Sequence, residues 1–153
     1  MRDKGEQAQA LFEEGYNCAQ SAAAPFAEEM GLSREDVLRL ASPFGGGMGR
    51  LREVCGAVSG MLLAAGMLYG YASPTDMQAK RDTYAMVQEL AARFREKNGS
   101  IICRELLGIS EAEGSPEPTP RTAAFYAQRP CAGLVRCAAE LLEEWDRERN
   151  REG

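Results

Sequence analysis

The chain has 153 residues, of which 44% are hydrophobic and 27% charged, and its formal net charge is −5. This length predicts a single domain over residues 1–153, large enough to bury a hydrophobic core, and the composition excludes a disordered tail. Basic residues are interleaved with acidic ones rather than clustered, so we expect no binding to nucleic acid.

The residue types favour helices over strands. The sequence contains 23 alanines but only 5 valines, 3 isoleucines and 4 threonines. Alanine is the best helix former, whereas strands favour β-branched and aromatic residues. We therefore expect an all-α, single-domain bundle of about five to six helices.

The N-terminal segment predicts two helices. A short amphipathic helix is expected to end at Gly15. Asn17 and Gln20 then form a capping-box pattern, which predicts a second helix over residues 18–30. This helix should be kinked near Pro25, because proline cannot donate a backbone hydrogen bond.

A glycine-rich segment follows a short helix capped by Ser33. Residues 42–49 read SPFGGGMG. No predicted strand precedes this segment, and the lysine and Ser/Thr of a nucleotide-binding P-loop are absent. We expect a tight structural turn rather than a phosphate site.

The most apolar part of the chain predicts a central Gly-rich helix at about 51–69. No charged residue occurs from Val54 to Thr75, and such a length can span a bilayer. However, the stretch holds four glycines, and the other predicted helices are amphipathic. Membrane association is therefore not expected, and a buried helix is favoured. Gly56 and Gly60 would let another helix approach it closely.

The second half of the chain predicts four further helical segments. Pro74 and Asp76 indicate the first turn of a long helix that ends near Lys97. Ser100 is expected to cap a helix over residues 101–107, and residues 108–120 to form an exposed loop. A weak helix is expected over 122–127 and a final one from residue 130. The expected core stripe of the long helix is Met77, Tyr84, Val87, Ala91 and Phe94.

The sequence contains no histidine. This absence excludes Ser-His-Asp and Cys-His catalysis, Cys/His zinc fingers and histidine-ligated haem. The adjacent glutamates at 13–14, 28–29 and 143–144 would point in different directions on a helix, which is typical of solvated faces. The cysteines are the residues left to carry chemistry.

The N-terminus is charged and lacks the apolar segment of a signal peptide, so we expect a cytoplasmic protein. Structural disulfides are uncommon in that compartment, where paired cysteines tend to be redox-active or metal-bound. The chain has five cysteines, an odd number, so at least one thiol is spare in any paired scheme.

Four of the five cysteines are predicted at or near helix N-termini: Cys18, Cys55, Cys103 and Cys131. Free N–H groups and the positive end of the helix dipole stabilise a thiolate there, which makes a cysteine nucleophilic or metal-binding. Arg52, Arg104 and Arg129 lie near these cysteines in sequence and would add to the effect if they face the sulfurs.

The alternative is that these cysteines are small apolar fillers of the core. Filler is the favoured interpretation for Cys137, which is predicted in the middle of the last helix. The spacing contains no C-x-x-C, so it does not group the other four by itself.

The four cysteines lie in segments that resemble the C_GCAxxG_C_C family of redox-active proteins. The segments are GYNCAQS, FGGGMGR, VCGAVSGMLLAAGMLYG, IICRELLG and PCAGLV. The resemblance covers most of the chain. It implies that Cys18, Cys55, Cys103 and Cys131 form one group, with Cys137 an addition and Cys131 and Cys137 open to exchange of roles.

Three hypotheses follow. In the first, a pair among the four cysteines performs thiol–disulfide exchange or electron transfer with a redox partner protein or a small thiol. In the second, all four are ligands of an iron–sulfur cluster or zinc. In the third, the cysteines are structural and the chain is a helical interaction module, for example a homo-oligomer that packs through its glycine-rich helix. No cofactor is certain from the sequence.

Overall fold

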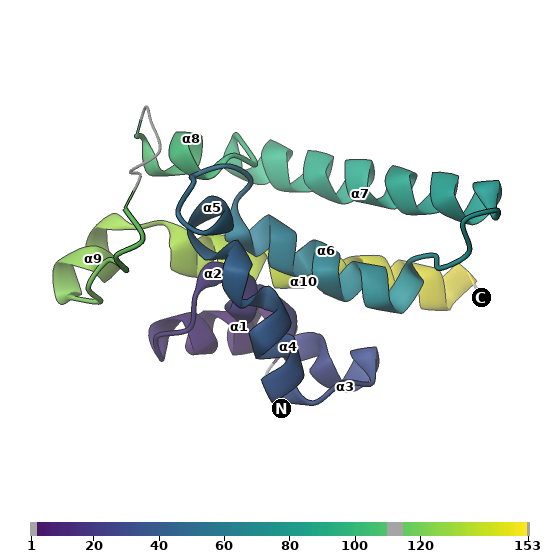
Figure 1. Ribbon diagram of the computed structural model, residues 1–153, viewed down its shortest axis with the longest axis horizontal. Coiled ribbons are helices and arrows are strands. Elements are labelled where there is room, and N and C mark those ends of the chain that lie inside the picture. The colour runs from purple at the N-terminus through teal and green to yellow at the C-terminus, as the bar shows by residue number, and fades with distance from the viewer. Residues whose placement is uncertain (1–2, 110–114, 153) are drawn as a thin grey trace.

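The computed structural model describes residues 3–109 and 115–152, and these residues form an all-helical fold (Figure 1). Five helices have eight residues or more, namely α1 (Lys4–Glu13), α4 (Arg34–Ala41), α6 (Gly56–Tyr69), α7 (Met77–Asn98) and α10 (Cys131–Glu152). The shorter segments are α2 (Cys18–Ala23), η1 (Ala24–Phe26), α3 (Ala27–Met30), η2 (Ser42–Phe44), α5 (Gly45–Met48), α8 (Cys103–Leu107) and α9 (Ala123–Gln128). The fold class is confirmed, and the helix count exceeds the expected five to six.

The extra helices arise largely where the backbone is interrupted. The predicted helix over 18–30 is present, but Pro25 turns its middle into the 3₁₀ segment η1. Its start is confirmed, since Asn17 and Gln20 form a reciprocal capping box. Of the predicted loop over 108–120, residues 110–114 lie outside the described part, and residues 115–120 are described without a helix.

Helix α6 runs through the centre of the molecule, as predicted. It packs against α2 and α10, and its buried residues include Ala57, Val58 and Met61. A Cβ atom at Gly60 would lie against the Ala19 carbonyl oxygen, closer than real Cβ contacts come. The backbones of α2 and α6 therefore touch, which glycine at this position permits. No helix within the described ranges is long and apolar enough to cross a membrane.

The first and last helices pack along each other, so the two ends of the chain share one core. Ala8, Leu11 and Phe12 of α1 are buried in this core. At its edge, the Arg136 guanidinium donates a 2.9 Å hydrogen bond to Gln9. This packing holds α10 beside α1 and α2. It thereby sets the position of the start of α10, where Cys131 lies.

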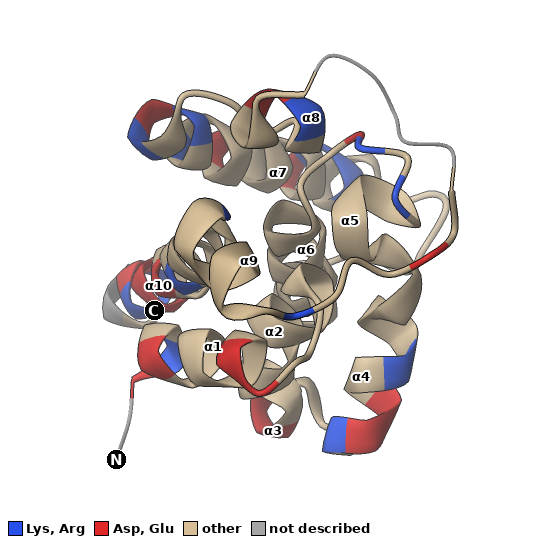
Figure 2. Ribbon diagram, turned by 90° about the vertical axis from the view of Figure 1, so that its left-hand side faces the viewer, with Lys and Arg blue, Asp and Glu red and all other residues tan. Residues whose placement is uncertain are grey.

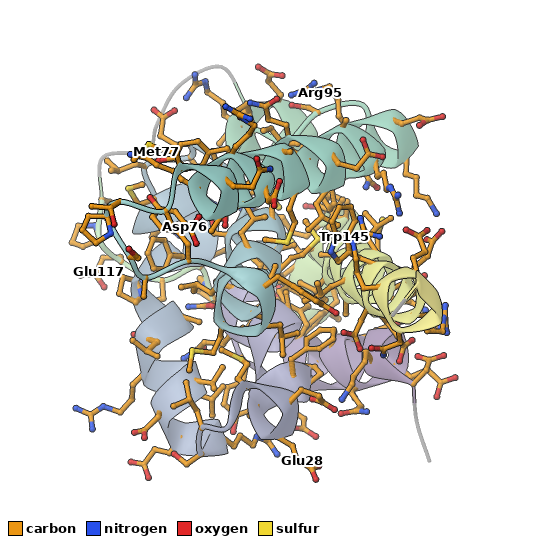
Figure 3. The ribbon with its side chains drawn as sticks, turned by 90° about the vertical axis from the view of Figure 1, so that its right-hand side faces the viewer. Glu28, Asp76, Met77, Arg95, Glu117 and Trp145 are labelled. Atoms are coloured by element: carbon orange, nitrogen blue, oxygen red, sulfur yellow. The ribbon has the colours of Figure 1, made fainter. Side chains whose placement is uncertain are left out.

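Helix α7 runs lengthwise along α6 and α10 (Figure 1), and its buried stripe differs from the predicted one. Met77 and Tyr84 are exposed, and the buried residues are Met86, Leu90 and Phe94 at a spacing of four. Met77 and Tyr84 line an open surface of α7 together with Lys80 and Arg81, so these apolar side chains meet solvent. Seen from the right-hand side of Figure 1, Met77 marks the start of α7, and Trp145 lies on α10 below that helix (Figure 3).

Three predicted helix starts were wrong by a few residues. Helix α6 begins at Gly56 rather than near Leu51, because the preceding residues adopt left-handed backbone angles. Helix α7 begins after Asp76, whose side chain accepts from the backbone of the first turn, rather than at the preceding proline. Ser100 does not cap α8; its hydroxyl accepts from the Ile102 N–H instead.

Candidate functional site: four cysteines at helix starts

Each of the four predicted cysteines lies at the start of a helix. Cys18, Cys103 and Cys131 are the first residues of α2, α8 and α10, and Cys55 is the N-cap of α6. This confirms the placement expected from the sequence. First-turn N–H groups face two of the sulfurs: the Cys18 sulfur accepts from its own N–H, and the Cys55 sulfur accepts from the backbone of Ala57.

A short backbone contact holds the starts of α6 and α8 together. Val54 and Ile102 form an isolated antiparallel bridge. On either side of it, the Cys55 N–H donates to the Ile101 carbonyl at 2.7 Å, and the Cys103 N–H donates to the Glu53 carbonyl at 2.6 Å. These bonds place Cys55 and Cys103 side by side, although 48 residues separate them in the chain.

The glycine-rich segment forms the wall between α2 and α8. Gly46 and Gly47 have φ of 68° and 69°, which glycine adopts without a steric penalty. The Gly46 N–H donates to the Cys18 sulfur. A Cβ at Gly47 would lie 2.6 Å from the Cys103 Cβ. The segment is the tight turn we predicted, but its contact with two cysteines was not foreseen.

The Cys18 and Cys131 side chains interact directly with each other. The Cys131 S–H donates to the Cys18 sulfur, and this is the largest cause of a Cys18 pKa lowered to about 6. The N–H groups of Gly46 and of Cys18 itself also lower this pKa, as does the positive charge of Arg121. The same hydrogen bond, together with burial, raises the pKa of Cys131. One thiolate and one thiol therefore face each other at neutral pH.

Cys55 and Cys103 are buried, and both remain protonated. Burial and the charge on Cys18 raise the pKa of Cys55 to about 12. Burial also raises the pKa of Cys103, although the Arg52 guanidinium lies 3.7 Å from its sulfur and opposes the effect. Both thiols lie near Cys18, but neither is set up as a nucleophile.

The fifth cysteine stands apart from this group. Cys137 lies on α10, half-buried, and its sulfur accepts a 3.4 Å hydrogen bond from the Asn98 side chain. It does not line the cavity beside Cys18 and Cys131. This position fits the expectation that Cys137 fills space between helices.

A cavity of about 410 Å³ opens onto the Cys18–Cys131 pair. It is lined by the glycine-rich segment, the loop before α9, the start of α10 and two phenylalanines. The lining residues are Phe12, Asn17, Cys18, Ser42, Gly45, Gly46, Gly49, Arg50, Arg52, Pro116, Pro118, Thr119, Arg121, Phe125, Arg129 and Cys131. Cys55 and Cys103 are not among them, so a molecule in the cavity meets only two of the four thiols.

Of the arginines expected near the sulfurs, two are there and one is not. Arg52 and Arg129 line the cavity, whereas Arg104 pairs with Glu53 at 3.2 Å. Arg121 was missed by the sequence analysis, since it lies ten residues from the nearest cysteine in the chain. Nothing in the local pattern marks it.

The four-thiolate metal hypothesis finds no support in this geometry. Within the described ranges, no three or more Cys, Asp or Glu side chains are arranged so that they could hold a metal ion.

The fold and the site define an all-helical protein that gathers four dispersed cysteines at the starts of four helices. The chain belongs to the family described as "Putative redox-active protein (C_GCAxxG_C_C)", whose model matches residues 16–145. The match confirms the resemblance drawn from the cysteine-containing segments. No curated protein and no solved structure matches the chain.

Proposed function

We propose that this protein exchanges thiols and disulfides through one pair of cysteines, with Cys18 as the attacking thiolate and Cys131 as the resolving thiol. The observation that carries the proposal is that these two thiols face each other at the wall of a cavity. A Cys18 pKa of about 6 keeps the attacking sulfur ionised at neutral pH.

The reaction balances with a disulfide as the oxidant. The Cys18 thiolate attacks one sulfur of the disulfide, a mixed disulfide forms, and the other half leaves as a thiolate. Cys131 loses its proton to solvent and attacks the Cys18 sulfur, releasing the second half as a thiolate. Two electrons have then moved from the protein to the oxidant, and Cys18 and Cys131 are joined by a disulfide bond. A dithiol reductant reverses these steps.

Cys55 and Cys103 have a supporting role in this proposal. Their raised pKa values keep them uncharged, so the negative charge of the site is concentrated on Cys18. They are also absent from the cavity wall. The sequence hypothesis allowed any pair among the four, and the geometry favours the pair that a substrate can reach.

The test is a map of the disulfides that form under mild oxidation. Protein reduced under nitrogen is oxidised with a small excess of a soluble disulfide, remaining thiols are alkylated, and peptides are analysed by mass spectrometry. We expect a Cys18–Cys131 linkage and three alkylated cysteines, with the same linkage in the Cys137→Ser control. Five alkylated cysteines, or a linkage between another pair, would contradict the proposal.

A further inference from the structure

The cavity in front of Cys18 carries a charge opposite to that of the whole protein. The chain has a formal net charge of −5, yet the cavity is lined by four arginines and by no aspartate or glutamate of the described residues. The basic positions beside α5 and those that flank α9 lie on one side of the molecule (Figure 2). Such a concentration of one sign attracts anions.

Arg121 is held in place by neutral groups. Its guanidinium donates 2.9 Å hydrogen bonds to the carbonyls of Phe12 and Tyr16, and it lies 4.2 Å from the centre of the Phe12 ring. None of the ion pairs formed among the described residues includes it. Its position is thus fixed before any ligand arrives, while its charge is not neutralised by a carboxylate.

Arg129 supplies a second charge near the pair. It lies 5.3 Å from the centre of the Phe125 ring and takes part in no ion pair within the described ranges. Its charge acts on both Cys131 and Cys103, which places it near the sulfurs. A disulfide approaching Cys18 therefore meets cationic groups contributed by both ends of α9.

The size and lining of the cavity point to a small molecule. A volume of about 410 Å³ lies within the range of small-ligand sites, which is roughly 300–1,000 Å³. Phe12 and Phe125 give it an apolar wall, and the arginines give it the polar groups that recognise carboxylates. The pair is at the wall of a recess, where a compact molecule fits more readily than a folded protein surface.

We propose that the Cys18–Cys131 pair acts on low-molecular-weight disulfides whose halves carry carboxylates, and that Arg121 and Arg129 bind those carboxylates. This inference rests on the proposed thiol–disulfide function. Each half of the substrate leaves as a carboxylate-bearing thiolate, and its two electrons come from the cysteine pair. A dithiol reductant restores the pair for the next turnover.

The test compares three aliphatic disulfides of similar size and different charge: 3,3′-dithiodipropionate, bis(2-hydroxyethyl) disulfide and cystamine. The rate of Cys18–Cys131 oxidation in the full-length reduced protein is measured with each, and is divided by the rate with a simple model thiol. We expect the dianion to be favoured over the dication by at least about tenfold at low salt, with the neutral disulfide in between. High salt should reduce the ratio.

Two variants of Arg129 test whether this residue is a source of the selectivity for the dianion. Arg129→Gln should reduce the ratio of dianion to dication rates, and Arg129→Lys should restore most of it. Arg136→Gln is the matched control, because this arginine lies on α10 with Cys131 but pairs with Glu140 outside the cavity. We expect it to leave the ratio unchanged.

Failure of this inference is distinguishable from failure of the function. If all three disulfides oxidise the pair in the proportions of the model thiol, the substrate class is wrong and thiol exchange stands. The substrate class is equally wrong if cystamine is favoured, or if Arg129→Gln leaves the ratio unchanged. If no disulfide oxidises the pair, the proposed function itself is overturned.

Discussion

At Cys18, several donors act on one sulfur. The thiol of Cys131, the N–H groups of Gly46 and of Cys18, and the charge of Arg121 all stabilise the thiolate, and they outweigh the cost of burial. Of these contributions, only that of the Cys18 N–H follows from the position of this cysteine at the start of a helix. The others come from segments that the fold brings in, so the lowered pKa is a property of the assembled site.

The dominant role of Cys131 can be tested by replacing its sulfur. In a Cys137→Ser background, Cys131→Ala removes the donor, and we expect the Cys18 pKa to rise from about 6 toward the ordinary thiol value of about 8.5. Cys131→Ser keeps an O–H donor and should give a smaller rise. The thiolate exists above this pKa and is lost as pH falls through it, so the measurement is the alkylation rate of Cys18 against pH. Equal profiles for both variants and the parent would contradict the assigned role.

Among the helices, the contact between α2 and α6 positions the site most directly. These helices carry Cys18 and Cys55 at their starts, and their close approach depends on small residues. A Cβ atom added at Gly56 would lie 3.2 Å from the Cys18 Cβ. Gly60 faces the Ala19 backbone one turn further along α6.

We expect a side chain at Gly60 to lower the free energy of unfolding, because it would push α2 and α6 apart. Gly60→Ala should destabilise the protein by roughly 1–3 kcal/mol, because the new Cβ meets backbone that cannot move without separating the helices. Gly66→Ala is the control in the same helix. A Cβ there has nothing within 4 Å, so it should stabilise the helix by up to about 1 kcal/mol. Urea unfolding of both variants measures the difference, and equal effects would show that the contact is not tight.

Much of this arrangement could be predicted from the sequence, because the signals are local. Asn17 with Gln20 specified the start of α2, and an uncharged stretch specified the buried helix α6. The grouping of four cysteines was available only through the family resemblance. The hydrogen-bonded pair and the role of Arg121 were not predictable, because they depend on contacts between residues more than 100 positions apart in the chain.

The start of α6 shows why local reasoning also failed. Apolar periodicity extends back to Leu51, and a helix from that point satisfies the pattern. Residues 52–55 instead form backbone hydrogen bonds with the residues at the start of α8 and just before it. The Cys55 N–H, for example, donates to the Ile101 carbonyl. A contact made 46 residues further along the chain thus overrides the helical preference.

For the molecule as a whole, the site links stability to pH. The pKa of Cys18 is lower in the folded protein than in an unfolded chain, so its thiolate stabilises the fold above the unfolded value. That contribution is lost as pH falls through about 6. Cys55 acts in the opposite direction but only above an ordinary thiol pKa, where its raised value of about 12 keeps it protonated.

Between about pH 6 and about pH 8.5, the free energy of unfolding should therefore rise more in the wild-type protein than in Cys18→Ser. We expect the excess rise to be on the order of 2–3 kcal/mol. The measurement is urea unfolding of both proteins under reducing conditions across this range, with Cys137→Ser as the control that keeps the wild-type slope. Parallel curves for wild type and Cys18→Ser would show that the thiolate is not stabilised by folding.

The segment after Gly47 carries a further consequence for how the sequence can change. Met48, Arg50 and Arg52 have φ of 71°, 68° and 60°, angles that cost a residue with a side chain roughly 1–2 kcal/mol and that glycine adopts freely. Glycine would be the easier residue at each position, yet two of the three place a guanidinium at the cavity wall. The protein retains these charges against its own backbone preference. At Arg50 and Arg52, conformational stability can be gained only by giving up part of the positive field in front of the thiols, so a search for more stable variants and a search for more active ones will diverge at these two positions.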